Sequence, residues 1–132
     1  MVFLSICAII QGMKKPEFEF YQRPNGHIEF IEFLQSLPDK DRSKLVATIA
    51  NVQDQGLIVA RKMKWIKKLD DNLFELRSKT GNNIQRGLYF HVTDTNYQVT
   101  HGFSKKAQKT PPYEIKHAMK IRDEYWEEHK ND

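Results

Sequence analysis

The fold of this chain is decided by the stretch LFELRSKTGNNIQRGLYFHVTDTNYQVTHGF, residues 73–103. Two short polar segments, residues 80–82 (TGN) and 94–95 (DT), interrupt it. Segments of this kind join neighbouring antiparallel strands. The stretch therefore predicts three consecutive strands, over residues 73–79, 83–93 and 96–103.

Ahead of these strands, the sequence predicts one strand and two helices. Residues 17–21 alternate charged and aromatic side chains, as a half-buried strand does. A helix is expected over residues 25–37 and a second over residues 39–55, with Gly56 just past its end. The short link between them predicts an antiparallel helical hairpin. The apolar face of the first helix consists of Phe30, Phe33, Leu34 and Leu37.

A last helix is expected after the third strand of the central stretch. Thr110 is suited to cap it, with Pro111 at its first position and Glu114 near its positive end. The element order is then β-α-α-β-β-β-α. This order predicts an α+β fold: a mainly antiparallel sheet with a helical hairpin and a C-terminal helix, the helices packed on one side.

The length of 132 residues is that of one domain, which we assign to residues 13–132. Residues 1–12 form an apolar segment with no basic residue ahead of the run, and the segment is too short to span a bilayer. We interpret it as an N-terminal extension from an upstream start codon, with a signal peptide as the alternative. One cysteine and five scattered histidines predict neither a disulfide framework nor a metal site.

Positive charge is concentrated in the middle of the chain. Residues 60–110 hold eleven Lys or Arg and four Asp or Glu, a balance of +7, whereas the flanking segments are slightly acidic. This distribution is typical of a nucleic-acid-binding protein. A solvated lysine-rich face is the alternative explanation.

Three charged side chains of the central strands are expected to lie close together. Successive strand residues point to opposite faces, so Glu75 and Arg77 share a face, and Arg86 lies on the next strand. If both arginines point to an open face, they flank a groove that Lys105 and Lys106 close at one end. Such cations can hold a phosphate and stabilise the charge that develops on it during RNA cleavage.

Three segments carry a resemblance to a known family: residues 74–77 (FELR), 86–90 (RGLYF) and 103–111 (FSKKAQKTP). Together with the element order, they resemble the RelE/HigB toxins of bacterial type II toxin–antitoxin pairs, within the RelE/ParE superfamily and near its phage-derived HigB-like branch. The resemblance covers residues 17–125. It implies a cytoplasmic, ribosome-dependent mRNA endoribonuclease that uses no metal or cofactor and is bound by an antitoxin, a small helix-turn-helix protein.

The resemblance also implies roles for individual residues. Arg86 matches the most dependable catalytic arginine of these toxins, and Lys105 and Lys106 match their second basic group. Some members use lysines on the strand that holds Glu75, and others use a nearby glutamate as general base, so the general base and acid are left open. These toxins often add a tyrosine or histidine near the C-terminus, and Tyr113 is the nearest candidate. The full candidate sets are Glu75, Arg77, Arg86, Lys105 and Lys106 for catalysis, and Lys62, Lys64, Lys67, Lys68, Lys109 and Tyr113 for RNA binding.

The same residues also allow purely structural interpretations. Glu75 and Arg77 can form a simple solvated salt bridge, and Arg86 can be a charge that protects an exposed sheet edge. His91 and His101 are left outside the site as structural residues. Two other functions also fit: a non-catalytic ParE-like toxin that inhibits DNA gyrase, and a basic RNA-binding module of the double-stranded-RNA-binding type.

Overall fold

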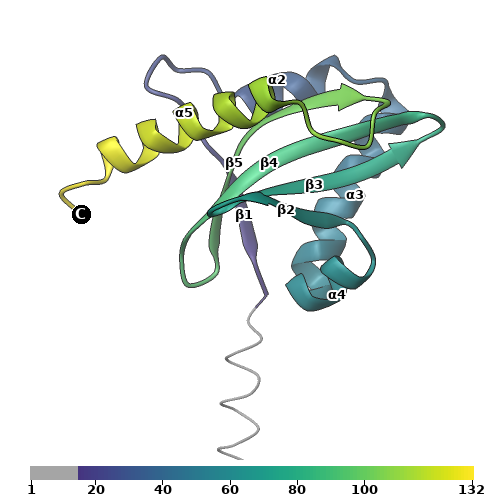
Figure 1. The fold of residues 1–132 in the computed structure, drawn as a ribbon, viewed down its shortest axis with the longest axis horizontal. Coiled ribbons are helices and arrows are strands. Elements are labelled where there is room, and N and C mark those ends of the chain that lie inside the picture. Colours follow the sequence, from purple (N-terminus) through teal and green to yellow (C-terminus); the bar gives the residue numbers. More distant parts are fainter. Residues whose placement is uncertain (1–14) are drawn as a thin grey trace, which may run out of the picture.

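The computed structural model of the chain describes residues 15–132 (Figure 1). The predicted extension, residues 1–12, lies outside this range. The helices are α2 (Glu29–Ser36), α3 (Asp39–Gln55), α4 (Leu57–Lys62) and α5 (Pro112–Glu128). The strands are β1 (Glu17–Phe20), β2 (Ile66–Asp70), β3 (Leu73–Thr80), β4 (Asn83–Thr93) and β5 (Asn96–Lys105).

The five strands form one sheet in the order β1-β5-β4-β3-β2. All neighbours are antiparallel except β1 and β5, which run parallel. The predicted α+β class and the mainly antiparallel sheet are confirmed. Because β4 lies in the middle of the sheet, its residues have neighbouring strands on both sides.

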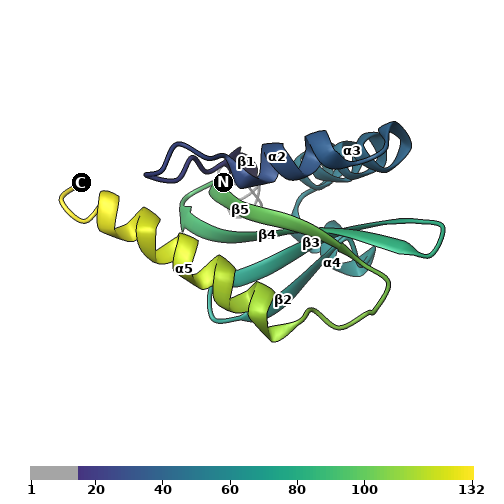
Figure 2. The same cartoon turned by 90° about the horizontal axis from the view of Figure 1, so that it is seen from above.

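The helices cover both faces of the sheet, so the expectation that they pack on one side is wrong. Figure 2 shows α2 and α3 on one face and α5 on the other. The physical reason lies in β4, which presents apolar side chains in both directions. Tyr89 packs in the core under α2 and α3, whereas Leu88 and Phe90 belong to clusters on the α5 face.

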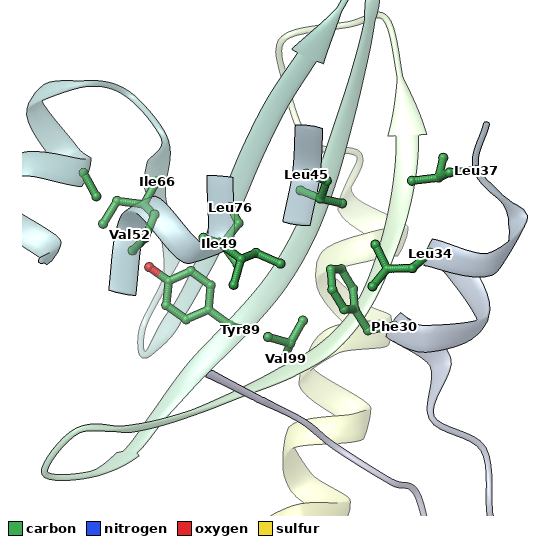
Figure 3. Close-up of a cluster of buried hydrophobic side chains, with 11 residues drawn as sticks. Phe30, Leu34, Leu37, Leu45, Ile49, Val52, Ile66, Leu76, Tyr89 and Val99 are labelled. Carbon is green, nitrogen blue, oxygen red and sulfur yellow. The ribbon is translucent and has the colours of Figure 1, made fainter. Parts of the chain in front are cut away.

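The largest apolar cluster fills the space between the helical hairpin and the sheet (Figure 3). Phe30 of α2 and Leu45 of α3 are fully buried there, against Tyr89 and Val99 of the sheet. The predicted apolar face of the first helix is therefore the face that packs. The helix itself starts later than expected, at Glu29, because the chain makes a turn ahead of it in which the Gly26 amide donates to the Arg23 carbonyl.

Two glycines let α2 lie directly on the sheet. Gly87 and Gly102 face each other across β4 and β5. A Cβ atom at Gly102 would stand 2.3 Å from the ring of Phe33, and one at Gly87 would stand 2.8 Å from the ring of Phe30. Side chains at these positions would push α2 away, so the missing side chains set the spacing between helix and sheet.

Two short elements, α4 and β2, were not predicted. Both fall in the lysine-rich stretch before β3, and β2 is an edge strand whose lysines are exposed. Gly56 (φ 87°) turns the chain from α3 into α4, and Lys64 (φ 62°) turns it from α4 towards β2. Within residues 15–132, no helix combines the length and the apolar composition needed to cross a bilayer.

Candidate active site

A buried charged cluster joins β3, β4 and the loop that precedes α5. The Arg77 Nε donates to one carboxylate oxygen of Glu75, and the Thr110 hydroxyl donates to the other. The Arg86 Nη1 lies 3.9 Å from Glu75 Oε2 and donates to the Thr110 Oγ1 at 3.1 Å. The side chains of Glu75 and Arg86 are both 0% exposed. The structure thus brings the three predicted strand residues together around one carboxylate.

The position of these side chains follows from the strand register. Arg77 is the partner of Arg86 across β3 and β4, so the two arginines share a face, as expected from the alternation of strand residues. Glu75 lies two residues from Arg77 on that same face. The carboxylate therefore stands where it offsets the repulsion between two neighbouring guanidinium groups.

Arg86 is enclosed on all sides. Its guanidinium carbon lies 5.6 Å from the centre of the Phe103 ring on β5. Burial lowers the pKa of Arg86 from its usual value, while the nearby charge of Glu75 acts in the opposite direction; an arginine nevertheless stays protonated. Its Nε and Nη2 have no hydrogen-bond partner among the described residues. Unpaired buried donors are uncommon and costly, about 1–3 kcal/mol each.

The segment 106–111 closes over the two arginines. The Arg77 Nη1 donates to the Gln108 side-chain oxygen at 3.3 Å, and the Nη2 donates to the Gln108 carbonyl. Thr110 holds the same segment to Glu75 and Arg86. The prediction that Thr110 caps α5 is wrong, because Pro111 is the N-cap and the hydroxyl serves the charged cluster instead.

These contacts decide between the interpretations of the strand residues. Glu75 and Arg77 do form an ion pair, but it is not a solvated one, since the Glu75 side chain is fully buried. Arg86 does not protect an edge, because β4 is a central strand. The expected open groove is not formed: the face is covered by α5 and residues 106–111, and Arg86 is buried beneath them.

The predicted lysines lie outside the buried cluster. Lys105, Lys106 and Lys109 are exposed. The Lys105 Nζ stands 5.6 Å from the centre of the ring of Tyr113, a residue that is 59% exposed. The three lysines, at the end of β5 and just after it, therefore form a solvent-facing rim rather than a part of the buried group.

A cleft lies beside this cluster, at the end of β3. It has a volume of about 330 Å³. Arg77 lines the cleft and also belongs to the buried charged cluster. Of the predicted RNA-binding residues only Lys64 lines it; Lys62 ends α4, and Lys67 and Lys68 lie on β2. The residues that line the cleft are Lys44, Thr48, Lys64, Trp65, Arg77, Ser78, Lys79, Ile84 and Gln108.

Sequence reasoning missed Lys44 and Lys79 as members of this cleft. Lys44 lies on α3 beside the buried stripe that begins at Leu45, and Lys79 is near the end of β3. The two positions are 35 residues apart, yet the Lys44 Nζ donates to the Lys79 carbonyl oxygen. Their proximity depends on α3 packing against β3, which no local sequence signal reveals.

Histidines left outside the predicted site take part in a second polar network. His101 on β5 is buried, and its Nε2 lies 3.1 Å from a Glu114 carboxylate oxygen on α5. The His117 Nε2 lies 2.8 Å from Glu29, and the two histidine rings are 4.7 Å apart. His101 is the register partner of Leu88, so it shares the sheet face of Arg86. Its contacts tie α5 to the sheet.

Comparison with known proteins gives a family for the chain. The model of the family described as Phage derived protein Gp49-like (DUF891) matches residues 32–123, from α2 to α5. This range includes the whole charged cluster. No curated protein matches the sequence. The family is one associated with the toxins of toxin–antitoxin systems. The chain belongs to the Gp49-like family of phage-derived proteins.

Proposed function

We propose that the protein is the toxin of a toxin–antitoxin pair and acts in the cytoplasm as a RelE/HigB-type endoribonuclease that cuts mRNA on the ribosome. The family and the α+β fold support the toxin assignment. The observation that carries the nuclease is Arg86, whose Nε and Nη2 have no hydrogen-bond partner among the described residues and lie beside the Glu75–Arg77 pair. A phosphate oxygen is the acceptor that such donors bind best.

The chemistry needed is modest and uses no metal in this proposal. The 2′-hydroxyl of the RNA attacks the adjacent phosphorus, the phosphorus–5′-oxygen bond breaks, and a 2′,3′-cyclic phosphate forms. Arg77 and Arg86 stabilise the charge on the phosphorane-like transition state, with Lys105 and Lys106 at the rim as further cations. A base must take the 2′-hydroxyl proton and an acid must protonate the 5′-oxygen; Glu75 and Tyr113 are the candidates.

Arg86 reaches a phosphate only if residues 106–111 move aside. In the closed arrangement, Gln108 and Thr110 occupy acceptor positions on the arginines. A phosphate offers equivalent oxygens with a full negative charge, so it replaces these neutral acceptors without leaving Arg77 unpaired. The closed arrangement is then the resting state of the enzyme, and RNA binding opens it.

One observation favours a non-catalytic toxin as the second candidate. The complete burial of Arg86 also suits a purely structural charge, as expected for a ParE-like protein that inhibits DNA gyrase. A double-stranded-RNA-binding module is less suitable, since such modules have no leading strand and helical hairpin, and this chain has β1, α2 and α3.

The partner in this proposal is a small antitoxin, and the fold offers it an apolar surface. Ile58, Val59 and Met63, in and after α4, are 58%, 37% and 56% exposed. Burial of these side chains by a partner would remove apolar area from water.

The test is expression of the full chain in bacteria with primer-extension mapping of mRNA ends. We expect growth arrest that the adjacent gene relieves, together with new mRNA ends that appear only when the ribosome translates the message. Arg86→Ala should remove the cuts, while Lys116→Ala, an exposed change on α5, should leave them. Arrest without cuts would overturn the nuclease and favour the gyrase-inhibiting toxin, and normal growth with abundant protein would overturn the toxin.

A further inference from the structure

We infer that the cleft at the end of β3 binds a single-stranded RNA backbone and leads it to the candidate active site. The inference rests on the proposed function and names the path of its substrate. The cleft, of about 330 Å³, lies between three parts of the chain: Lys44 and Thr48 on α3, residues 64–65 before β2, and residues 77–79 near the end of β3. Neither Lys44 nor Lys79 was expected to bind RNA from the sequence.

The charge of the cleft points to an anion. Among residues 15–132, the lining includes four cations and no acidic residue: Lys44, Lys64, Arg77 and Lys79. Of these, only Arg77 is paired with a carboxylate in the described ion pairs, that of Glu75. Three lysines thus stand together in one hollow without a neighbouring counter-charge among its lining residues, which attracts a chain of phosphates.

An unpartnered hydroxyl also faces this region. Ser78 lines the cleft, the residue is 5% exposed, and its Oγ has no hydrogen-bond partner among the described residues. A buried hydroxyl without a partner is uncommon, and a ligand oxygen would satisfy it. Ser78 lies on β3 between Arg77 and Lys79, and the alternation of strand residues points its hydroxyl to the opposite sheet face, the one that α3 covers.

The walls favour a single strand. Trp65 lines the cleft, where it packs on the main apolar cluster and stays partly exposed, so an unpaired base can stack on its exposed part. Lys64 directly precedes this tryptophan and turns the chain towards β2 through a left-handed backbone conformation, φ 62°. A duplex, whose bases are already stacked in pairs, does not use such a ring.

The cleft continues into the candidate active site through Arg77. This arginine lines the cleft with one part of its side chain and contacts Glu75 with its Nε. Gln108, which covers Arg77, is also a lining residue. A strand bound in the cleft therefore has its next phosphate at Arg77 and beside Arg86, and it meets the segment that must move.

The experiment measures binding of a short, fluorescently labelled single-stranded RNA to the purified full chain by anisotropy over a range of salt concentrations. We expect Lys44→Gln/Lys79→Gln to weaken binding about tenfold at low salt and to reduce the slope of log K against log salt by about 1.4, roughly 0.7 per lost contact. The control is Lys116→Gln/Lys120→Gln, with two exposed lysines one turn apart on α5.

The result that overturns the inference is an equal affinity and slope for the cleft variant and the wild type. Tighter binding of the same sequence as a duplex would overturn the single-strand claim. Each result can be separated from the proposed function: if wild type cuts mRNA in cells and the cleft variant binds normally, the nuclease stands and the cleft fails. If wild type never cuts but the cleft variant loses binding, the cleft stands and the nuclease fails.

Discussion

Arg77 and Arg86 stand opposite each other across β3 and β4, and Glu75 pairs with both from within the same sheet face. Two neighbouring guanidinium groups repel each other, so the carboxylate stabilises the fold whatever the function. The segment 106–111 completes the arrangement through Thr110. Stability and the candidate chemistry therefore depend on the same few side chains, and experiments must separate the two.

Glu75→Gln tests how much the buried ion pairs of this cluster contribute to the stability of the fold. The change keeps the size of the side chain but leaves Arg77 and the buried Arg86 without their negative partner. We expect a loss of about 3–5 kcal/mol in the free energy of unfolding, the usual cost of removing one partner of a buried ion pair. Chemical denaturation measures it, with the exposed Glu127→Gln as a control that should change stability by about 0.5 kcal/mol or less. A Glu75 variant as stable as this control would contradict the assignment.

Thr110→Val tests whether the hydroxyl holds residues 106–111 down. The change removes the donor to Glu75 and the acceptor of Arg86 while keeping the shape. We expect destabilisation of about 1–3 kcal/mol and faster amide hydrogen exchange in residues 106–111. Thr110→Ser keeps the hydroxyl and should stay close to wild type. Equal exchange in the two variants would show that the contact does not hold the segment.

Much of the fold follows from local patterns, whereas the cluster depends on their assembly. The turns at residues 80–82 and 94–95 and the alternation of the strands predict β3 to β5, and hence that Glu75 and Arg77 share a face. Whether that face is open depends on which side of the sheet α5 covers, and the pattern of α5 itself does not state this. The apolar pair Leu88 and Phe90 on β4 was the available signal that this face also needs a cover.

The lysine-rich stretch shows the second limit. Its composition predicts an attraction for nucleic acid, but it does not show which of the lysines lie close together in the folded protein. Packing of α3 on β3 joins Lys44 and Lys79, far apart in the chain, and leaves Lys67 and Lys68 on the edge strand β2. The short β2 escaped prediction because an exposed edge strand lacks the apolar alternation of a half-buried one.

Gly102→Ala tests the close contact between α2 and the sheet. A Cβ at this position would stand 2.3 Å from the Phe33 ring and 2.8 Å from the Arg86 carbonyl oxygen, so the ring and the strand backbone must both adjust. We expect a loss of about 1–3 kcal/mol in unfolding free energy, as for other overpacked sites. Phe33→Leu in the same chain should recover part of that loss, giving a measurable coupling in a double-mutant cycle. Additive losses would mean that Phe33 is not the obstacle.

Arg23→Gln tests the acid sensitivity of the contact between α2 and α5. Hydrogen bonds from Arg23 lower the pKa of Glu124 on α5. For Glu29 on α2, burial acts to raise the pKa. Hydrogen bonds from His117 and Arg23 outweigh the burial, so the pKa of Glu29 is also lowered. Carboxylates with lowered pKa values stabilise the fold above their unfolded pKa, about 4.3, and this contribution is lost as the pH falls through the folded values.

The wild type should therefore lose stability below about pH 4.3 more steeply than Arg23→Gln, while Arg23→Gln is already less stable at neutral pH. Denaturant titrations between neutral and acid pH measure both slopes. The matched control is Arg61→Gln, an exposed arginine on α4, which should keep the wild-type slope in the acid range. Parallel curves for wild type and Arg23→Gln would place the acid sensitivity elsewhere.

Lys106→Ala tests the candidate chemistry with little risk to the fold. Lys106 is exposed on the segment that leads from β5 to α5, so its removal should leave the unfolding free energy within about 0.5 kcal/mol of wild type. If its ammonium contacts the phosphate in the transition state, the mRNA cleavage rate should fall about 10²–10³-fold, as when an oxyanion contact is lost. Lys106→Arg should recover part of the rate, since a cation returns to the rim, and Lys116→Ala should cut at the wild-type rate.

Primer extension in expressing cells compares the cleavage rates of wild type and the three variants, and binding of the antitoxin checks that each protein is folded. Full cutting by Lys106→Ala would remove this lysine from the site and leave the charge stabilisation to Arg77 and Arg86.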